Sequence, residues 1–304
     1  MKNSDKKLPL SAILLAIFCN TVFGSAVPVI KLGCTYFGIT DGAFDKMLYA
    51  GIRFFISGVL VFFLSMIINK RLPLPKKSNA LNVVAVALTY TFLQYLFLYI
   101  GFSKVAGTIS SVLSATSVFM AVVLAHFIYP DDRLNLKKGV GSIIGFIGVL
   151  LASVSGISSA VPTLFGEGFI IIGTAFFVIG SFFVKRATRI DNSFTVTAYN
   201  LLIGGGLLSV VGLIGGGSFT VTAEGIIALS YLIFVSSVGF SLWSVLLKKY
   251  PVGKISVYSF IIPVSGSVFS AILLGDNLFS PTFFFALILV CIGIYTVNSD
   301  KIKK

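Results

Sequence analysis

The side chains that could do chemistry in this sequence are hydroxyl and amide groups set at helical spacing inside long apolar stretches. Ser110, Ser114 and Ser117 fall on one face of a helix, because steps of three and four residues return to the same side. Gln94 lies near the middle of another stretch, where an amide facing lipid would be costly, so it must face protein or water. These neutral groups could hydrogen-bond a small polar molecule. Small hydroxyl residues also let helices pack closely, and that alternative stays open for each serine.

Groups for acid–base, nucleophilic or metal chemistry are scarce. The sequence has one histidine, His126, and three widely spaced cysteines, so neither a metal-ligand spacing nor a disulfide framework is visible. All ten acidic residues fall in loops, at termini or at helix ends, so no carboxylate is expected deep in a membrane span. No glycine-rich loop that would cradle a nucleotide phosphate is present. We expect no metal, no cofactor and no enzyme activity.

The composition is that of an integral membrane protein. The 304 residues are 57% hydrophobic and 11% charged, whereas an ordinary soluble domain has roughly a quarter charged residues. The net charge of +13 could indicate nucleic-acid binding, but the basic residues are spread in small groups between apolar stretches. We therefore expect a lipid bilayer around the protein and no nucleic-acid partner.

Ten apolar stretches approach the length of about 20 residues that a helix needs to cross a bilayer. The first is longer than the apolar core of a signal peptide, so it is counted as a helix. This pattern predicts an all-α integral membrane fold with ten transmembrane helices. The ten stretches are 8–30, 47–68, 80–102, 107–129, 139–157, 165–184, 194–214, 225–247, 254–274 and 279–298.

The basic residues predict which helix ends face the cytoplasm. With the N-terminus inside, the inner loops and termini carry 19 of the 23 lysines and arginines, and only Lys31, Lys46, Arg53 and Lys104 lie outside. Cytoplasmic loops of membrane proteins carry such an excess of positive charge. We therefore expect a multi-pass protein of the cell (inner) membrane with both termini in the cytoplasm.

Two parts of the sequence repeat each other. GTISSVLSATSVFMAVVLA at 107–125 aligns with GKISVYSFIIPVSGSVFSA at 253–271, and an aspartate two residues before a leucine follows each, at Asp132 and Asp276. GFIGV at 145–149 and VCIGI at 290–294 come next, and GSFFVK at 180–185 is a weaker echo of 24–31. The prediction is two five-helix repeats, 1–157 and 158–304. Because five is odd, the second repeat is inverted in the membrane, as in many secondary transporters.

These segments resemble the EamA branch of the drug/metabolite transporter superfamily over nearly the whole chain. The resemblance rests on FGSAVPVIK (23–31), IRFF (52–55), LYIGFSKVAGTISSVL (98–113) and PVSGSVFSAILLGDNL (263–278). The chain departs from the family pattern at Phe23, where many relatives have tryptophan, at Ser117, which replaces a proline, and at aspartates that replace glutamates. The resemblance implies a ten-helix carrier of small metabolites, often amino acids, that commonly exports them.

The predicted substrate site lies near the membrane midplane between the two repeats, where carriers with inverted repeats bind. Gly24 and Pro28 in the first helix and Pro263 in the ninth are predicted hinges, because proline removes a backbone hydrogen bond. Close packing through small residues is the alternative. The residues predicted to line the substrate pathway are Asn20, Ser25, Gln94, Tyr95, Tyr99, Ser110, Ser114, Ser117, Ser241, Ser244, Ser256 and Ser259.

Two of the outer basic residues need a separate interpretation. Arg53 is expected about one and a half turns inside the second helix, where pairing with a loop carboxylate such as Asp41 or Asp45 is favoured over substrate binding. Lys31 is expected to extend to the outer interface, because lysines near helix ends usually do so.

The sequence predicts a secondary transporter that exports small amphipathic metabolites, such as amino acids or related compounds, across the cytoplasmic membrane by alternating access. A passive facilitator or channel for small solutes is the alternative. A membrane-embedded enzyme is disfavoured, because it would need a catalytic pair or metal cluster. The expected partner is a small-molecule substrate. Its identity, any ion coupling and the oligomeric state of the protein stay open at this point.

Overall fold

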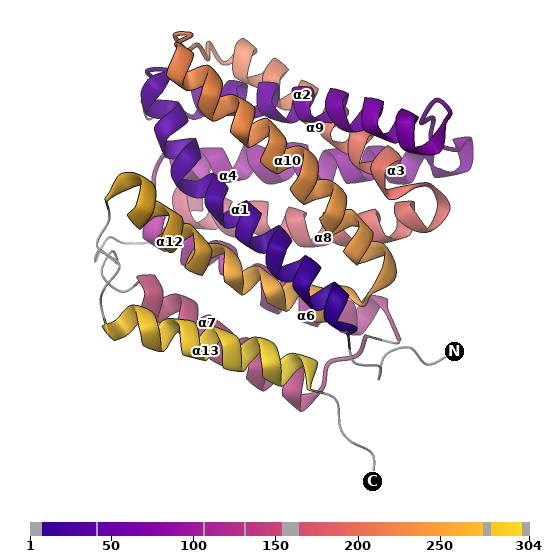
Figure 1. Ribbon diagram of the computed structural model, residues 1–304, viewed down its shortest axis with the longest axis vertical. Helices are drawn as coiled ribbons and strands as arrows, with labels where there is room; N and C mark the ends of the chain where they lie inside the picture. The colour runs from indigo at the N-terminus through magenta and orange to yellow at the C-terminus, as the bar shows by residue number, and fades with distance from the viewer. Residues whose placement is uncertain are drawn as a thin grey trace.

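Helices are the regular elements of the computed structural model, which describes residues 8–40, 42–105, 107–130, 132–153, 164–275 and 281–299 (Figure 1). The elements up to residue 153 are α1 (Leu10–Tyr36), α2 (Ala43–Asn69), η1 (Lys77–Asn79), α3 (Ala80–Val86), η2 (Ala87–Leu93), α4 (Gln94–Phe102), α5 (Gly107–Ala115), α6 (Ser117–Ile128) and α7 (Leu136–Ser153). The later elements are η4 (Leu164–Gly168), α8 (Phe169–Ile190), α9 (Ser193–Ile214), α10 (Ala223–Lys249), α11 (Val252–Ser256), η5 (Val257–Phe260), α12 (Ile261–Leu274) and α13 (Pro281–Asn298).

Several of these helical stretches are long and apolar enough to cross a membrane, so the chain is a multi-pass membrane protein. The described residues contain 7 such stretches: Leu10–Tyr36, Ala43–Asn69, Lys77–Phe102, Leu164–Ile190, Ser193–Ile214, Ala223–Lys249 and Val252–Leu274. Val112–Ile128 and Phe284–Asn298 are shorter apolar helical stretches. The all-α membrane class is confirmed, and the count of ten spans stays a prediction.

Helix ends follow local sequence signals. The Asn192 side chain accepts a hydrogen bond from Phe194 N at the start of α9, and Thr222 accepts one from Gly225 N at the start of α10. Both residue types are favoured N-caps, because they satisfy an amide that has no partner inside the helix. Gly275 ends α12 with a φ of 75°, a left-handed conformation that glycine adopts without a steric penalty.

Two helices extend further than the hydropathy pattern predicts. Helix α1 runs without a break through Pro28 to Tyr36, and Lys31 lies exposed on it, in agreement with its expected position at the surface. Helix α2 begins at Ala43, four residues before the predicted start at 47. Hydropathy marks only the part of a helix that lies in the apolar core of the bilayer. Helix bounds predicted from hydropathy therefore miss polar first and last turns.

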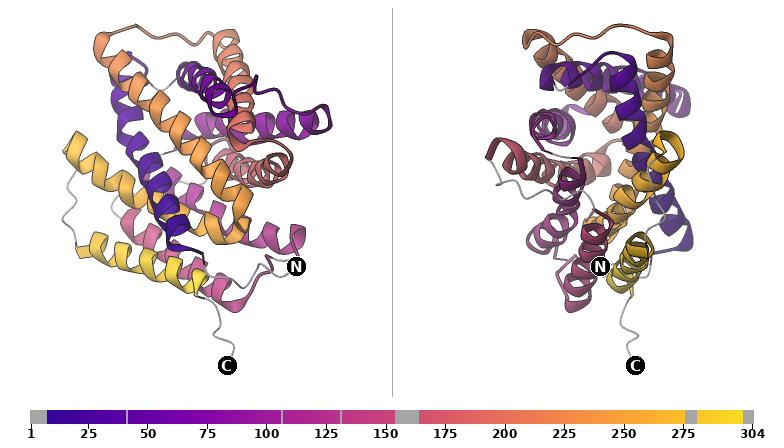
Figure 2. Two further views of the ribbon diagram at one scale, coloured as in Figure 1. Left: turned by 45° about the vertical axis from the view of Figure 1, so that its right-hand side comes forward. Right: turned by 90° about the vertical axis from the view of Figure 1, so that its left-hand side faces the viewer.

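Helices that are distant in the sequence pack in pairs. Helix α2 lies along α9 at one edge of the bundle, and α7 lies along α13 at the opposite edge (Figure 1). Two further views show α13 beside α7 as well (Figure 2). Helix α1 packs on α10 and α12, and α8 packs on α3, η2 and α4. The α2–α9 contact depends on glycine, since a Cβ at Gly205 would lie 2.5 Å from Phe55 N.

Loops that were predicted to lie on the same side of the membrane contact each other. At the inner end, the end predicted to be cytoplasmic, Lys76 N donates to Asp191 Oδ2 (3.2 Å) and Lys137 Nζ donates to Ser299 O (2.8 Å). At the opposite, outer end, Ser218 N donates to Asp45 Oδ1 (2.7 Å). These contacts agree with the predicted alternation of the helices. Which end faces the cytoplasm, and which membrane holds the protein, stay predictions.

Candidate substrate site

Aromatic rings from five helical segments meet in the interior of the bundle. Phe240 of α10 packs edge-on against Phe23 of α1 (5.5 Å between ring centroids), Phe54 of α2 (5.8 Å) and Tyr90 of η2 (5.7 Å). Tyr95 of α4 lies 4.5 Å from Phe54. We call these five residues the central aromatic cluster. Because α10 follows residue 158 and the others precede it, the cluster joins the two predicted repeats.

A widened turn positions the third helical stretch against this cluster. Segment η2, Ala87–Leu93, has π-helical hydrogen bonding between α3 and α4, and both Tyr90 and Thr91 are buried there. Tyr90 stacks on Phe177 of α8 (5.1 Å), while Thr91 Oγ1 donates to Asn200 Oδ1 of α9 (2.9 Å). Single π-helical turns occur frequently at functional sites. The sequence ALTYTFL contains no proline or glycine, so it carried no signal for this turn.

Arg53 lies beside the central aromatic cluster and is almost fully buried, with 4% of its surface exposed. Its guanidinium carbon is 4.2 Å from the centroid of the Phe54 ring, which in turn packs on the Tyr95 ring at 4.5 Å between centroids. Because α2 begins at Ala43, Arg53 lies ten residues into the helix, nearly three turns, which is deeper than the sequence indicated.

The predicted pairing of Arg53 with Asp45 is wrong. Asp45 lies eight residues earlier, about 12 Å along the helix axis, and its Oδ1 accepts from Ser218 N at the outer end. Asp41 lies outside the described residues. No carboxylate in the described part of the chain lies within ion-pair distance of Arg53, and Arg53 Nε has no hydrogen-bond partner there.

Three of the predicted pathway residues are buried with an unsatisfied polar atom among the described residues. They are Asn20 of α1, Gln94 of α4 and Ser241 of α10, whose unpaired atoms are Oδ1, Oε1 and Oγ. Asn20 Nδ2 donates to Ala16 O (2.7 Å), so within the described residues it is the side-chain oxygen that lacks a partner. Buried polar atoms in native proteins are nearly always hydrogen-bonded, and each exception needs an explanation.

Other predicted pathway residues form contacts between helices. Ser25 Oγ of α1 hydrogen-bonds with the Tyr231 hydroxyl of α10 (2.7 Å), and Thr197 Oγ1 of α9 donates to Ser244 Oγ of α10 (2.9 Å). Tyr99 lies 5.9 Å from Tyr95 and extends the aromatic surface by one turn of α4. Ser25 and Ser244 therefore hold helices together in this conformation.

The serines of the predicted fourth helix, 107–129, lie on helices whose main packing partners differ from those of α1. Helices α5 and α6 pack mainly on α7, α8 and α11, whereas α1 packs on α10 and α12. Ser114 Oγ donates to Ser110 O (2.8 Å), and Ser117 is buried on α6. Ser256 is buried at the end of α11, which packs on α6, and Ser259 is half-buried in η5.

Gly24, one of the predicted hinges of α1, packs on α12 next to the predicted hinge Pro263. A Cβ on Gly24 would lie 1.9 Å from Ser265 Oγ and 2.8 Å from Ile262 O, so only glycine permits this approach. Pro263 stands between these two contacts and follows the 3₁₀ segment η5, while Pro28 is buried within a continuous α1. The structure thus places Gly24 of α1 against the part of α12 that contains Pro263, at a contact between the two predicted repeats.

The inner end is held by a buried ion pair that sequence analysis missed. Lys138 Nζ lies 2.6 Å from Asp132 Oδ1, and the exposed fractions of the two side chains are 4% and 2%. Asp132 Oδ2 accepts from Gly253 N in α11 (2.8 Å), so this pair joins the two predicted repeats. Lys185 Nζ donates to Leu247 O (3.0 Å) and to Tyr250 O nearby. In the sequence these residues are visible only as loop and helix-end charges.

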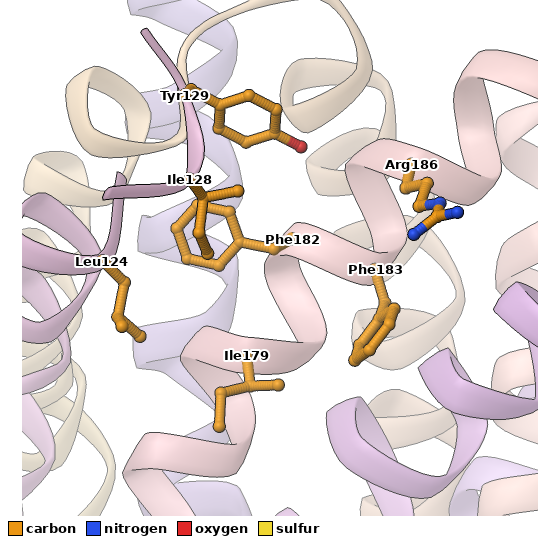
Figure 3. A pocket seen from close by; sticks show the side chains of 7 residues that line it. All are labelled: Leu124, Ile128, Tyr129, Ile179, Phe182, Phe183 and Arg186. Atoms are coloured by element: carbon orange, nitrogen blue, oxygen red, sulfur yellow. The ribbon is translucent and has the colours of Figure 1, made fainter. Parts of the chain in front are cut away.

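A cavity of about 230 Å³ lies between α6 and α8, away from the predicted pathway residues. Figure 3 shows its wall of apolar side chains, with the Arg186 guanidinium at one side. None of the predicted pathway residues lines it. Its lining residues are Leu124, Ile128, Tyr129, Ile179, Phe182, Phe183 and Arg186.

Comparison with known proteins identifies the family. The profile of the EamA-like transporter family matches residues 10–154 and 164–299, which together make up most of the chain. The chain belongs to the EamA-like transporter family. The family profile thus covers both the central aromatic cluster and the Asp132–Lys138 pair, because both lie within the matched residues of this EamA-family protein.

Curated relatives of this EamA-family protein carry transporter names. A probable amino-acid metabolite efflux pump of Escherichia coli is 27% identical over 298 residues, covering 93% of each chain. A protein of the same name from Salmonella typhimurium is 29% identical over 282 residues, covering 87% of each chain. A crystal structure with a TM-score of 0.78 covers 94% of this chain and 96% of its own at 17% identity, which shows a shared fold.

Proposed function

We propose that this EamA-family protein is an alternating-access exporter of small amphipathic metabolites, such as amino acids or related compounds, across the cytoplasmic membrane. The observation that carries the proposal is the central aromatic cluster with its unsatisfied polar neighbours. Asn20, Gln94 and Ser241 supply atoms that have no hydrogen-bond partner among the described residues, on helices that also carry rings of the cluster. An amphipathic solute offers an apolar body for the rings and polar groups for these atoms. The names of the two efflux-pump relatives support the same substrate class and direction.

The pattern of helix contacts supports two inverted five-helix repeats of one design. Exchanging the two halves maps α1 onto α8, α2 onto α9 and the stretch from α3 to α4 onto α10. It also maps α5–α6 onto α11–α12 and α7 onto α13. The contact of α1 with α10 then corresponds to the contact of α8 with α3, η2 and α4. The contact of α1 with α12 corresponds to the contacts of α8 with α5 and α6. The α2–α9 and α7–α13 pairs map onto themselves. Such halves can exchange their arrangements, which is the basis of alternating access.

The decisive experiment is transport by the purified protein in liposomes. Vesicles preloaded with an unlabelled amino acid should accumulate the labelled form transiently by counterflow, because a carrier exchanges solute across one alternating site. The panel contains leucine, phenylalanine, threonine and cysteine, with empty liposomes as the control. Saturable counterflow for at least one compound is expected. Linear, non-saturating flux would favour the passive facilitator, and absence of any flux would reject the carrier function.

The orientation of the helices has its own test. Cysteines introduced at Lys76 and Asp191 should be protected from an impermeant thiol reagent added to intact cells, whereas a cysteine at Gly217 should be labelled. A variant without the three native cysteines is the background. Labelling at Asp191 would contradict both the cytoplasmic assignment of the inner end and the inverted second repeat.

A further inference from the structure

Arg53 is a buried cation for which the described part of the chain supplies no counter-charge. It lies about 15 Å from the outer end of α2, in a helix about 40 Å long. Removing an arginine from water in a membrane protein is costly, and such groups mark substrate or ion pathways by default. A carboxylate partner would offset that cost, but none of the described carboxylates lies within ion-pair distance of it.

In the described part of the chain, Arg53 lies beside a row of aromatic rings that includes tyrosines. The guanidinium carbon lies 4.2 Å from the centroid of the Phe54 ring, and the Tyr95 and Tyr99 rings follow it at 4.5 Å from Phe54 and 5.9 Å from Tyr95. Tyrosine hydroxyls and ring faces attract a cation, but they are neutral and leave its charge uncompensated. Arg53 Nε, moreover, has no hydrogen-bond partner in the described part of the chain.

We propose that Arg53 binds the carboxylate of the transported molecule, with the rings of Phe54, Tyr95 and Tyr99 holding the apolar body beside it. This inference rests on the proposed carrier function and names the group that the carrier recognises. The planar guanidinium matches a carboxylate with two parallel hydrogen bonds. The aromatic surroundings favour a carboxylate attached to an apolar body over a small, strongly hydrated anion such as phosphate.

The test compares matched solutes that differ only in this group. Liposomes containing the wild-type protein, Arg53→Gln, Arg53→Lys or Arg71→Gln are assayed by counterflow with leucine and leucinamide, and with phenylalanine and phenylalaninamide. Arg71 is an exposed arginine just beyond α2 and serves as the control. We expect the wild-type protein and Arg71→Gln to prefer the carboxylate, and Arg53→Gln to lose at least about tenfold in its transport together with the preference. Arg53→Lys keeps the positive charge but lacks the planar guanidinium that donates two parallel hydrogen bonds. It should retain an intermediate preference for the carboxylate.

A second measurement separates recognition from a structural role. If Arg53 only stabilises the fold, Arg53→Gln should lower the melting temperature of the purified, ligand-free protein. We expect that temperature to be unchanged or higher, because the variant removes a buried charge to which the described residues supply no counter-charge.

The outcomes distinguish this inference from the carrier function on which it rests. Absence of transport of every compound by the wild-type protein would reject the carrier function and the inference with it. Equal transport of acids and amides, unchanged transport by Arg53→Gln, or a clearly lower melting temperature of that variant would overturn the inference while the carrier function stands.

Discussion

Lys138 and Arg53 are equally buried, since 4% of the surface of each residue is exposed, but their surroundings differ in charge. Lys138 at the inner end has Asp132 at 2.6 Å, and that carboxylate also accepts from Gly253 N. Arg53 beside the central aromatic cluster has no carboxylate partner among the described residues. The difference teaches that burial alone does not assign a role. A buried charge with its partner serves the fold, and one without a partner points to a ligand.

Breaking the buried pair should give the largest effect. Lys138→Met leaves the Asp132 carboxylate buried without its cation, and removing one partner of such a pair costs about 3–5 kcal/mol. We expect a strong loss of protein in the membrane and a lower melting temperature of the purified variant. The double variant Asp132→Leu with Lys138→Met removes both charges and should recover part of the stability. A Lys138→Met protein as stable as the wild type would remove the contrast with Arg53.

Replacing the carboxylate by an amide should have a smaller effect on the same pair. In Asp132→Asn the amide oxygen can still accept from Gly253 N or from Lys138 Nζ, but the ion pair is lost. We expect a cost of about 1–3 kcal/mol, because hydrogen bonds to charged groups lie in that range. Denaturation of the detergent-purified protein, compared with that of Lys138→Met, measures it. An effect larger than that of Lys138→Met would show that the Gly253 contact, and not the cation, dominates.

Gln94 is the neutral counterpart of Arg53, because its Oε1 is buried without a partner in the described chain. Gln94→Leu should raise the half-saturating concentration of the substrate several-fold, since one hydrogen bond contributes about 0.5–1.5 kcal/mol. Protein abundance should stay near that of the wild type. Counterflow kinetics and immunoblotting measure the two quantities. Unchanged transport, or failure of the variant to accumulate, would make Gln94 a structural residue.

The smallest effect should separate two serines of the same helix. Ser244 of α10 is bonded to Thr197 Oγ1 (2.9 Å), whereas Ser241 Oγ, one turn earlier, has no partner among the described residues. Ser244→Ala should lower stability by about 1 kcal/mol, and Ser241→Ala should leave stability unchanged but weaken transport. Melting temperatures and transport rates of the two variants are compared directly. The reverse pattern would mean that a lack of partners does not mark the substrate site.

Much of the candidate site follows from hydropathy and from the helical period. Gln94 could be assigned to the interior because an amide in lipid is costly, and it is buried. The sequence leaves the role of each serine open, because a hydroxyl group suits both a packed helix contact and a solute. The structure gives Ser25 and Ser244 protein partners and leaves Ser241 without one in the described part of the chain. Residue type and spacing do not distinguish these cases.

Arg53 shows why other parts of the candidate site could not be predicted from the sequence. Its depth depended on where α2 begins, and the polar first turn from Ala43 does not register as apolar. Its assumed partner, Asp45, is close in the sequence but is used by Ser218 of the loop that follows α9. A partner over 170 residues away cannot be anticipated from local spacing.

The sequence by itself determined the all-helical membrane class and the transporter family. Both follow from hydropathy, charge distribution and short motifs, which can be read along the chain without knowing how its helices pack. Only the tertiary structure decided which buried polar groups are satisfied. It placed Asp132 between Lys138 and Gly253 N and left Arg53 among aromatic rings. The reason is that hydrogen bonds and ion pairs act over a few ångströms, between atoms that distant helices bring together only when they pack.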